Sequence, residues 1–146
     1  MPTLKTSVEI GASAEQVWRL LTHFPAYPTW NPYIRAVSGT AEPGQRLRLR
    51  VRIPKGGVRL FSARIVKAIP AAELRWRRNL LIKGLFDREQ TFIMVPNGVK
   101  GVTFIQREEF SGLLAGLIAP FVTKKALLGL NLMNAALKKI AEAKKH

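Results

Sequence analysis

A long apolar segment, residues 108–140, most constrains what this chain can fold into. Its apolar side chains recur at the period of a helix, so one face of a long helix has to be buried. A stripe of that length needs a broad partner, and the alternating strands upstream supply one. We therefore expect a C-terminal helix that lies across the concave face of a curved antiparallel sheet. The stripe consists of Val122, Ala126, Gly129, Leu130, Met133, Ala136, Leu137 and Ile140.

Small residues are frequent along the same segment. Because a small side chain does not fill the gap between a helix and a sheet, these residues predict open volume beneath the helix. We therefore expect a cavity between the sheet and the C-terminal helix. The small residues are Gly112, Ala115, Gly116, Ala119, Ala126 and Gly129.

The clearest strand pattern lies in residues 46–53, where Leu47, Leu49 and Val51 alternate with arginines. Successive side chains of a strand point to opposite faces, so the apolar face is buried and the arginine face is wet. Tight turns between the strands predict an antiparallel meander. The other strands are predicted at residues 4–10, 34–38, 58–69, 73–79, 85–95 and 101–110.

Two short helices are predicted between the first two strands. Ser13 and Gln16 form a capping box for a helix over residues 14–22. Two prolines bracket a second short helix or turn around Tyr27. The fold class is therefore α+β, with a curved antiparallel sheet of about seven strands around a long C-terminal helix. We expect residues 1–146 to form a single domain.

Composition argues against several kinds of site. The chain has no cysteine and only two histidines, which disfavours disulfides and zinc sites. No phosphate-binding glycine motif occurs, and we expect no metal and no cofactor. The first residues lack the apolar core of a signal peptide. The apolar run at 113–122, which Pro120 and the following lysines are expected to end, is too short to span a bilayer. A cytoplasmic protein is expected.

The net charge of +15 stands out from the rest of the composition. Such a charge attracts polyanions, but the basic residues are spread along the predicted strands and helix, which favours a solvated surface. The arginine faces of residues 46–52 and 75–77 carry no interleaved aromatic residues for base stacking, so no specific nucleic acid is expected. A weak contact with an anionic membrane stays open, and we expect a monomer or a homodimer.

Five motifs are spread over the whole chain. They are Ile10-x-Ala12-Ser13-x-Glu15-x-Val17-Trp18-x-x-Leu21, Trp30-Asn31-Pro32-Tyr33-Ile34, Pro70-x-x-Glu73-Leu74-x-Trp76, Glu108-x-Phe110-Ser111-Gly112-Leu113-Leu114 and Met133-Asn134-x-Ala136-Leu137-Lys138. In these residues the chain resembles the helix-grip (SRPBCC, START-like) superfamily of START lipid-transfer domains, plant pathogenesis-related allergens and polyketide cyclases. Within it, the chain looks like the small bacterial polyketide cyclase/dehydrase-like members. The resemblance implies a helix-grip fold that binds or processes apolar molecules.

One departure from that superfamily affects the functional expectation. Related sequences often carry histidine in the last two strands, where this chain has Gln90 and Gln106. Because these histidines are replaced, the chain is expected to bind its ligand more than to catalyse a reaction on it. Both glutamines can donate and accept, so they would either orient a polar group of a ligand or bond to each other and the backbone.

Glu108 is the most informative polar residue of the predicted site. It shares the strand parity of Phe104 and Phe110, so its carboxylate is expected to point inward. A buried carboxylate is costly unless it is paired or protonated, and Arg78 and Arg88 are the candidate partners. The alternatives are a structural ion pair, which we favour, and a general acid or base, which makes Glu108 the candidate catalytic residue.

We interpret the chain as a protein that binds a small hydrophobic ligand, such as a lipid, polyketide or aromatic metabolite, between sheet and helix. Two alternatives stay open: a cyclase/dehydratase-type enzyme that uses Glu108 as acid or base, and a basic surface module for anionic membrane or nucleic acid. Trp76 fits the core and the cavity wall equally well. The predicted ligand-binding residues are Tyr27, Trp76, Arg78, Arg88, Gln90, Phe92, Met94, Phe104, Gln106, Glu108, Leu117, Phe121 and Met133.

Overall fold

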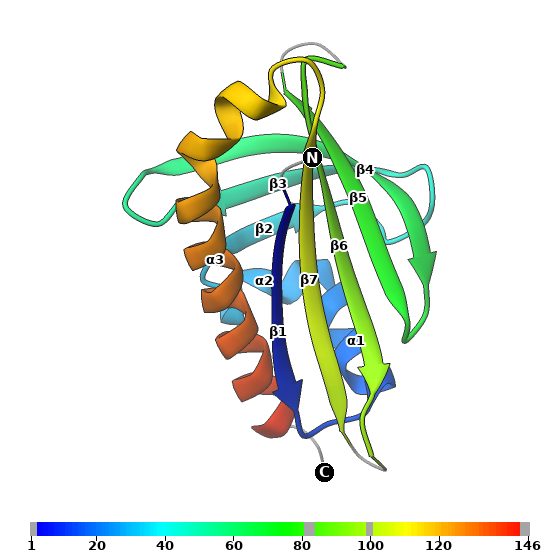
Figure 1. The fold of residues 1–146 in the computed structure, drawn as a ribbon. Coiled ribbons are helices and arrows are strands. Elements are labelled where there is room, and N and C mark those ends of the chain that lie inside the picture. The colour runs from blue at the N-terminus through cyan, green and yellow to red at the C-terminus, as the bar shows by residue number, and fades with distance from the viewer. Residues whose placement is uncertain (1–2, 81–83, 99–100, 144–146) are drawn as a thin grey trace.

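The computed structural model describes residues 3–80, 84–98 and 101–143. Strands and helices follow in the predicted order (Figure 1), and the predicted ranges of α1, β2 and β4 are identical to the observed ones. The elements are β1 (Thr3–Ile10), α1 (Ala14–Thr22), η1 (Phe24–Ala26), α2 (Tyr27–Trp30), β2 (Ile34–Ser38), β3 (Arg46–Arg52), β4 (Val58–Ile69), β5 (Glu73–Leu80), β6 (Phe86–Pro96), β7 (Val102–Ser111) and α3 (Ala115–Ala143).

The seven strands form one antiparallel sheet in the order β1-β7-β6-β5-β4-β3-β2. The sheet curls strongly, and the long helix α3 runs along its open side next to β1 (Figure 1). Besides β1, α3 contacts β6, β7 and the short helix α1. The predicted α+β helix-grip fold is therefore confirmed.

Strand β3 shows how the alternating pattern produces the sheet. Leu47, Leu49 and Val51 are buried, and the four arginines between and beside them are exposed. Burial of the apolar side chains stabilises the sheet by about 25 cal/mol per Å² of apolar surface removed from water. The arginines keep their charged groups in solvent on the convex face.

The N-terminal end of α1 is capped by Ser13, as the sequence predicts. The Ser13 hydroxyl oxygen accepts a hydrogen bond from the Gln16 backbone N–H at 3.1 Å, which satisfies one donor of the first turn. At the other end His23 is the C-cap residue, and its backbone N–H donates to the Arg19 carbonyl at 3.0 Å. These local bonds position α1 so that Val17 and Leu21 enter the core.

The start of α3 differs from the expectation. Pro120, predicted to end the apolar run, lies inside the helix. Proline removes one helical donor and crowds the preceding turn, which bends a helix without ending it. Figure 1 shows the first turns of α3 inclined to the rest. By length and composition alone the full helix could span a bilayer, at 29 residues and a mean hydropathy of 1.2 over its most apolar window. Its inner face packs on the sheet.

Gly112 makes the corner between β7 and α3. Its φ of 104° lies in the left-handed region, and a Cβ there would sit 2.6 Å from the Leu85 carbonyl oxygen. Glycine is the residue that meets both requirements without strain. The chain therefore turns at Gly112, and this corner directs the first turns of α3 back across the sheet.

Candidate functional site

The second half of α3 packs directly on the sheet. Leu130, Met133 and Leu137 are fully buried in the main core. At Gly129 the predicted open volume is absent, because the ring of Tyr33 fills it: a Cβ added to Gly129 would lie 2.1 Å from Cε1 of Tyr33. A small residue here allows a close approach between an aromatic ring and the helix backbone.

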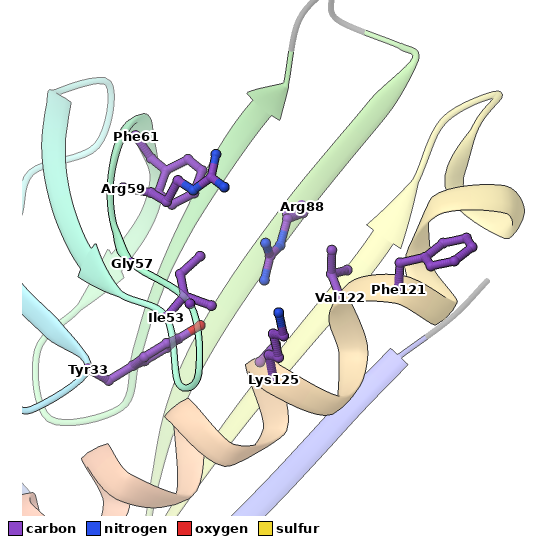
Figure 2. Close-up of a pocket in the computed structure, with 11 residues that line it drawn as sticks. Tyr33, Ile53, Gly57, Arg59, Phe61, Arg88, Phe121, Val122 and Lys125 are labelled. Atoms are coloured by element: carbon purple, nitrogen blue, oxygen red, sulfur yellow. The ribbon is translucent and has the colours of Figure 1, made fainter.

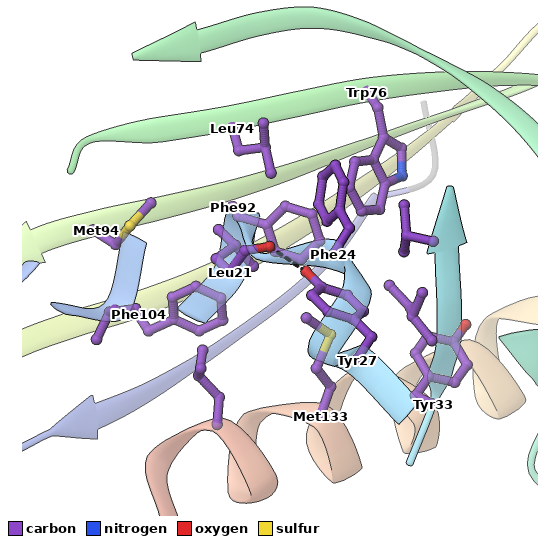
Figure 3. Close-up of a cluster of buried hydrophobic side chains, with 14 of the residues drawn as sticks. Leu21, Phe24, Tyr27, Tyr33, Leu74, Trp76, Phe92, Met94, Phe104 and Met133 are labelled. Atoms are coloured by element: carbon purple, nitrogen blue, oxygen red, sulfur yellow. Dashed lines mark hydrogen bonds between the residues drawn. The ribbon is translucent and has the colours of Figure 1, made fainter. Parts of the chain in front are cut away.

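Large aromatic residues fill the same end of the sheet. Figure 3 shows Phe24 of η1 and Tyr27 of α2 clustered with Trp76 and Phe92 of the sheet. The rings of Trp76 and Phe92 lie 5.0 Å apart edge to face, and Tyr27 donates its hydroxyl to the Leu21 carbonyl at 2.5 Å. Of the two assignments open for Trp76, the structure places it in the core. Six predicted ligand-binding residues belong to this core: Tyr27, Trp76, Phe92, Met94, Phe104 and Met133.

Four buried polar side chains cross from the sheet to α3. Gln90 Nε2 donates to Gln106 Oε1 at 3.1 Å, and Gln106 Nε2 donates to Asn134 Oδ1 at 2.7 Å. Asn134 Nδ2 then donates to Thr6 Oγ1 at 2.8 Å. Gln106 also donates to the Leu130 carbonyl at 3.2 Å. The two glutamines therefore bond to each other and to the helix, which joins β1, β6, β7 and α3 in one buried chain.

An ion cluster lies next to this chain on the same face of the sheet. Glu108 is buried, as its strand parity predicts, with its side chain 1% exposed. Its Oε1 accepts from Arg88 Nε at 2.5 Å and from Arg78 Nη2 at 3.4 Å, so the predicted ion pair is confirmed. Its Oε2 is buried and accepts no hydrogen bond from the residues that the structure describes. Arg78 and Arg88 occupy directly opposed positions on β5 and β6, and Glu108 bridges the two like charges.

Aromatic rings support both guanidinium groups. The guanidinium carbon of Arg78 lies 4.4 Å from the ring centre of Phe61, and that of Arg88 lies 5.1 Å from the ring centre of Phe110. Burial and, second, the positive charge of Arg88 lower the pKa of Arg78 to about 10. One carboxylate thus serves two buried cations, which leaves the cluster with an excess positive charge.

A pocket of about 370 Å³ opens to solvent between the β3–β4 hairpin, β6 and the first half of α3 (Figure 2). Arg88, a member of the ion cluster, forms part of the pocket wall. The ring of Tyr33, which fills the gap at Gly129, forms the inner boundary of the pocket. Small-molecule sites span roughly 300–1,000 Å³, so this volume is at the lower end of that range. The lining residues are Tyr33, Ile53, Gly56, Gly57, Arg59, Phe61, Arg88, Phe121, Val122, Lys125 and Ala126.

The predicted site residues are thus distributed over several environments. Arg88 and Phe121 line the pocket, and Arg78 and Glu108 lie in the ion cluster behind it. Leu117 points away from the sheet and is 69% exposed. Most of the remaining pocket residues were not predicted. The hairpin glycines and Arg59 carry no periodic signal, although Val122 and Ala126 belong to the predicted apolar stripe.

An apolar ridge lies on the outer side of the same part of the chain. Leu113, Leu117 and Phe121 are 86%, 69% and 78% exposed. Leu117 and Phe121 are four residues apart on α3 and are therefore neighbours, and Leu113 lies in the turn just before the helix. Lys124 and Lys125 follow directly and are exposed. Phe121 belongs both to this ridge and to the pocket lining, so the ridge borders the mouth of the pocket.

Comparisons with known proteins agree with this architecture. Residues 1–143 match the profile of a protein family described as polyketide cyclase / dehydrase and lipid transport. A START superfamily protein from Mycobacterium smegmatis is 26% identical, with 97% of each chain covered and a TM-score of 0.75. No curated protein matches the chain.

Two structures with lower identity share the fold. The Zhui aromatase/cyclase from Streptomyces sp. R1128 has a TM-score of 0.81 at 18% identity, with 99% of this chain and 96% of that chain covered. A norcoclaurine synthase point mutant from Thalictrum flavum, in complex with a transition-state analogue, has a TM-score of 0.74 at 13% identity, with coverage of 99% and 96%. The resemblance to START-like proteins predicted from the sequence is confirmed.

Proposed function

The chain belongs to the polyketide cyclase/dehydrase and lipid transport family, and on that premise we propose that it binds a small hydrophobic ligand in the pocket beneath the first half of α3. The observation that carries the proposal is the pocket itself. It combines apolar walls from Ile53, Phe61 and Val122 with an opening to solvent. Burial of apolar ligand surface, at about 25 cal/mol per Å², supplies the affinity.

The ion pairs of Glu108 favour binding over proton transfer. A general acid or base must come within hydrogen-bond reach of its substrate. Glu108 is held by Arg88 and Arg78 and does not belong to the described lining of the pocket. The cyclase/dehydratase alternative therefore gains no support from Glu108, whereas ligand binding requires no proton carrier.

A displacement assay with N-phenyl-1-naphthylamine, a neutral dye that fluoresces in apolar sites, tests the proposal. We expect saturable binding of one dye per chain. Val122→Trp should abolish it, because the indole would occupy the pocket. Leu128→Trp, at an exposed position of the same helix outside the lining, is the matched control and should bind as the unmodified chain does. Unsaturable binding, or equal binding by the two variants, would contradict the proposal.

A second function, contact with an anionic membrane at the pocket mouth, is favoured by the apolar ridge. Leu113, Leu117 and Phe121 could insert between lipid acyl chains, while Lys124, Lys125 and the net charge of +15 attract anionic headgroups. A membrane contact there would let an apolar ligand pass into the pocket without crossing water.

Sedimentation with vesicles tests this second function. We expect binding to vesicles that contain phosphatidylglycerol, weaker binding to pure phosphatidylcholine, and a loss with rising salt. Leu117→Ser combined with Phe121→Ser should abolish binding, and Leu132→Ser, at an exposed position outside the ridge, should not. If the chain ignores both kinds of vesicle and instead dimerises through these residues, the ridge is a protein interface.

A further inference from the structure

The pocket lining carries three cations from three different elements. Arg59 comes from β4, Arg88 from β6 and Lys125 from α3, and the described lining includes no acidic residue. Figure 2 shows Arg88 and Lys125 pointing toward one another across the pocket. Two like charges that converge on one space repel each other unless an anion lies between them.

We propose that the ligand of this pocket is an anionic amphiphile whose acidic group lies between Arg88 and Lys125 and whose apolar body packs along Tyr33, Phe61 and Val122. The inference rests on the proposed binding function and adds the chemical class of the ligand. A long-chain carboxylate is the simplest molecule of that class.

Arg88 is prepared for such a contact before the ligand arrives. Its side chain is 8% exposed, and its Nε–H is already bonded to Glu108. The ring of Phe110 supports its guanidinium group. This side chain is therefore already ordered and desolvated in the folded protein, so that an incoming acid would bind an oriented donor without a further ordering cost. Charge-assisted hydrogen bonds to guanidinium are stronger than bonds between neutral groups.

The charge of the buried cluster points the same way. Arg78 and Arg88 share one oxygen of Glu108, so the cluster retains one positive charge more than its carboxylate offsets. Burial and, to a smaller degree, this repulsion lower the pKa of Arg78. A ligand carboxylate beside Arg88 would offset the excess, whereas a neutral ligand of the same shape would not.

The walls around the cations suit an apolar chain. Ile53, Phe61, Phe121, Val122 and Ala126 surround the space, and Tyr33 closes its inner end against the helix. An acid bound at Arg88 would therefore have its chain packed against Tyr33, Phe61 and Val122. Lys125 is exposed, so its ammonium group stays in reach of a ligand that enters from solvent.

Two competitors that differ only in charge test the inference. Decanoate and 1-decanol are matched in chain length, and each is titrated below its solubility limit against bound N-phenyl-1-naphthylamine at pH 7. We expect decanoate to displace the dye at least about tenfold more strongly than decanol, since one charge-assisted bond is worth that factor. Lys125→Met combined with Arg59→Met should reduce the preference several-fold, with Arg88 left as the one cation of the described lining.

The matched control is Lys124→Met, which removes an exposed charge next to the pocket but outside its described lining. It should keep the full preference for decanoate. Equal displacement of the dye by decanoate and decanol, or a preference that the double substitution leaves unchanged, would overturn the anionic ligand and leave the binding pocket standing. Failure of the dye and of both competitors to bind at all would overturn the binding function with it.

Discussion

The second half of α3 is packed on the sheet through Leu130, Met133 and Leu137. The first half packs through Ala115 and Ala119 on a small cluster with Phe86 and Phe110, and beside that cluster it borders a pocket lined by Val122 and Lys125. The same helix and the same concave face produce both ends. The difference therefore lies in the sheet residues that meet the helix, and the boundary is the contact between Tyr33 and Gly129.

At the filled end, large uncharged side chains such as Phe92 and Phe104 occupy the space beneath the helices. At the open end, the inward positions hold Arg78, Arg88 and Glu108; both arginines donate to Glu108 and stack on neighbouring rings. Because these charged side chains pair along the surface of the sheet, they do not fill the space up to the helix. A buried ion cluster is thus a means of keeping volume open in a curved sheet.

The largest expected effect comes from breaking that cluster. Glu108→Ala leaves two buried guanidinium groups without their carboxylate and should lower the free energy of unfolding by about 3–5 kcal/mol. Glu108→Gln keeps the shape and one acceptor, so its loss should be smaller. Urea denaturation at pH 7 measures both.

The control for this experiment is Glu109→Ala, at the exposed neighbouring position of β7. It should change stability by no more than about 0.5 kcal/mol. If Glu108→Ala lowers the free energy of unfolding as little as the control does, the ion cluster does not stabilise the fold.

A smaller effect is expected at the boundary between the two ends. Alanine normally stabilises a helix by about 1 kcal/mol relative to glycine. At Gly129 the sign should reverse, because the new Cβ would overlap the ring of Tyr33, and overpacking typically costs about 1–3 kcal/mol. Gly116→Ala, at an exposed position of the same helix with open space around it, should be neutral or stabilising.

Thermal denaturation of the two glycine variants tests the boundary. If Gly129→Ala is as stable as Gly116→Ala, the ring of Tyr33 can move at little cost in free energy, and its contact with Gly129 does not fix the boundary between the packed end and the pocket. Because Tyr33 also lines the pocket, a displaced ring should weaken dye binding in the Gly129 variant alone.

Sequence patterns predicted the frame of this molecule well and the position of the pocket poorly. Period-two alternation in β3 and the cap at Ser13 depend on neighbours along the chain, so they can be read locally. The inward orientation of Glu108 and its arginine partners also followed from strand parity and charge. Which end of the concave face is filled depends on contacts such as Tyr33 with Gly129, between residues far apart in sequence, and no periodicity encodes that contact.

The two tyrosines permit a comparison of the two ends by pH. Tyr27 is fully buried at the filled end, and burial raises the pKa of its hydroxyl. The pKa of Tyr33 is raised by burial and by Glu108, but the charges of Arg88 and Arg78 act in the opposite direction. A raised pKa in the folded state gives stability that is present below the unfolded value of about 10 and is lost as pH rises through the folded value.

Tyr27→Phe should therefore show a cost that depends on pH. At pH 7 the variant loses the bond to the Leu21 carbonyl, worth about 1 kcal/mol. Above pH 10 the unmodified chain alone is destabilised by the tyrosine, by about 1.4 kcal/mol per pH unit, so the difference between the two should shrink and then reverse. Urea denaturation at pH 7, 10 and 11 measures it, and other titrating groups cancel in the difference. Tyr33→Phe should follow the same course but level off at a lower pH, because the positive charge of Arg88 stabilises its phenolate. Equal and pH-independent differences for both variants would show that neither end shields its tyrosine from water.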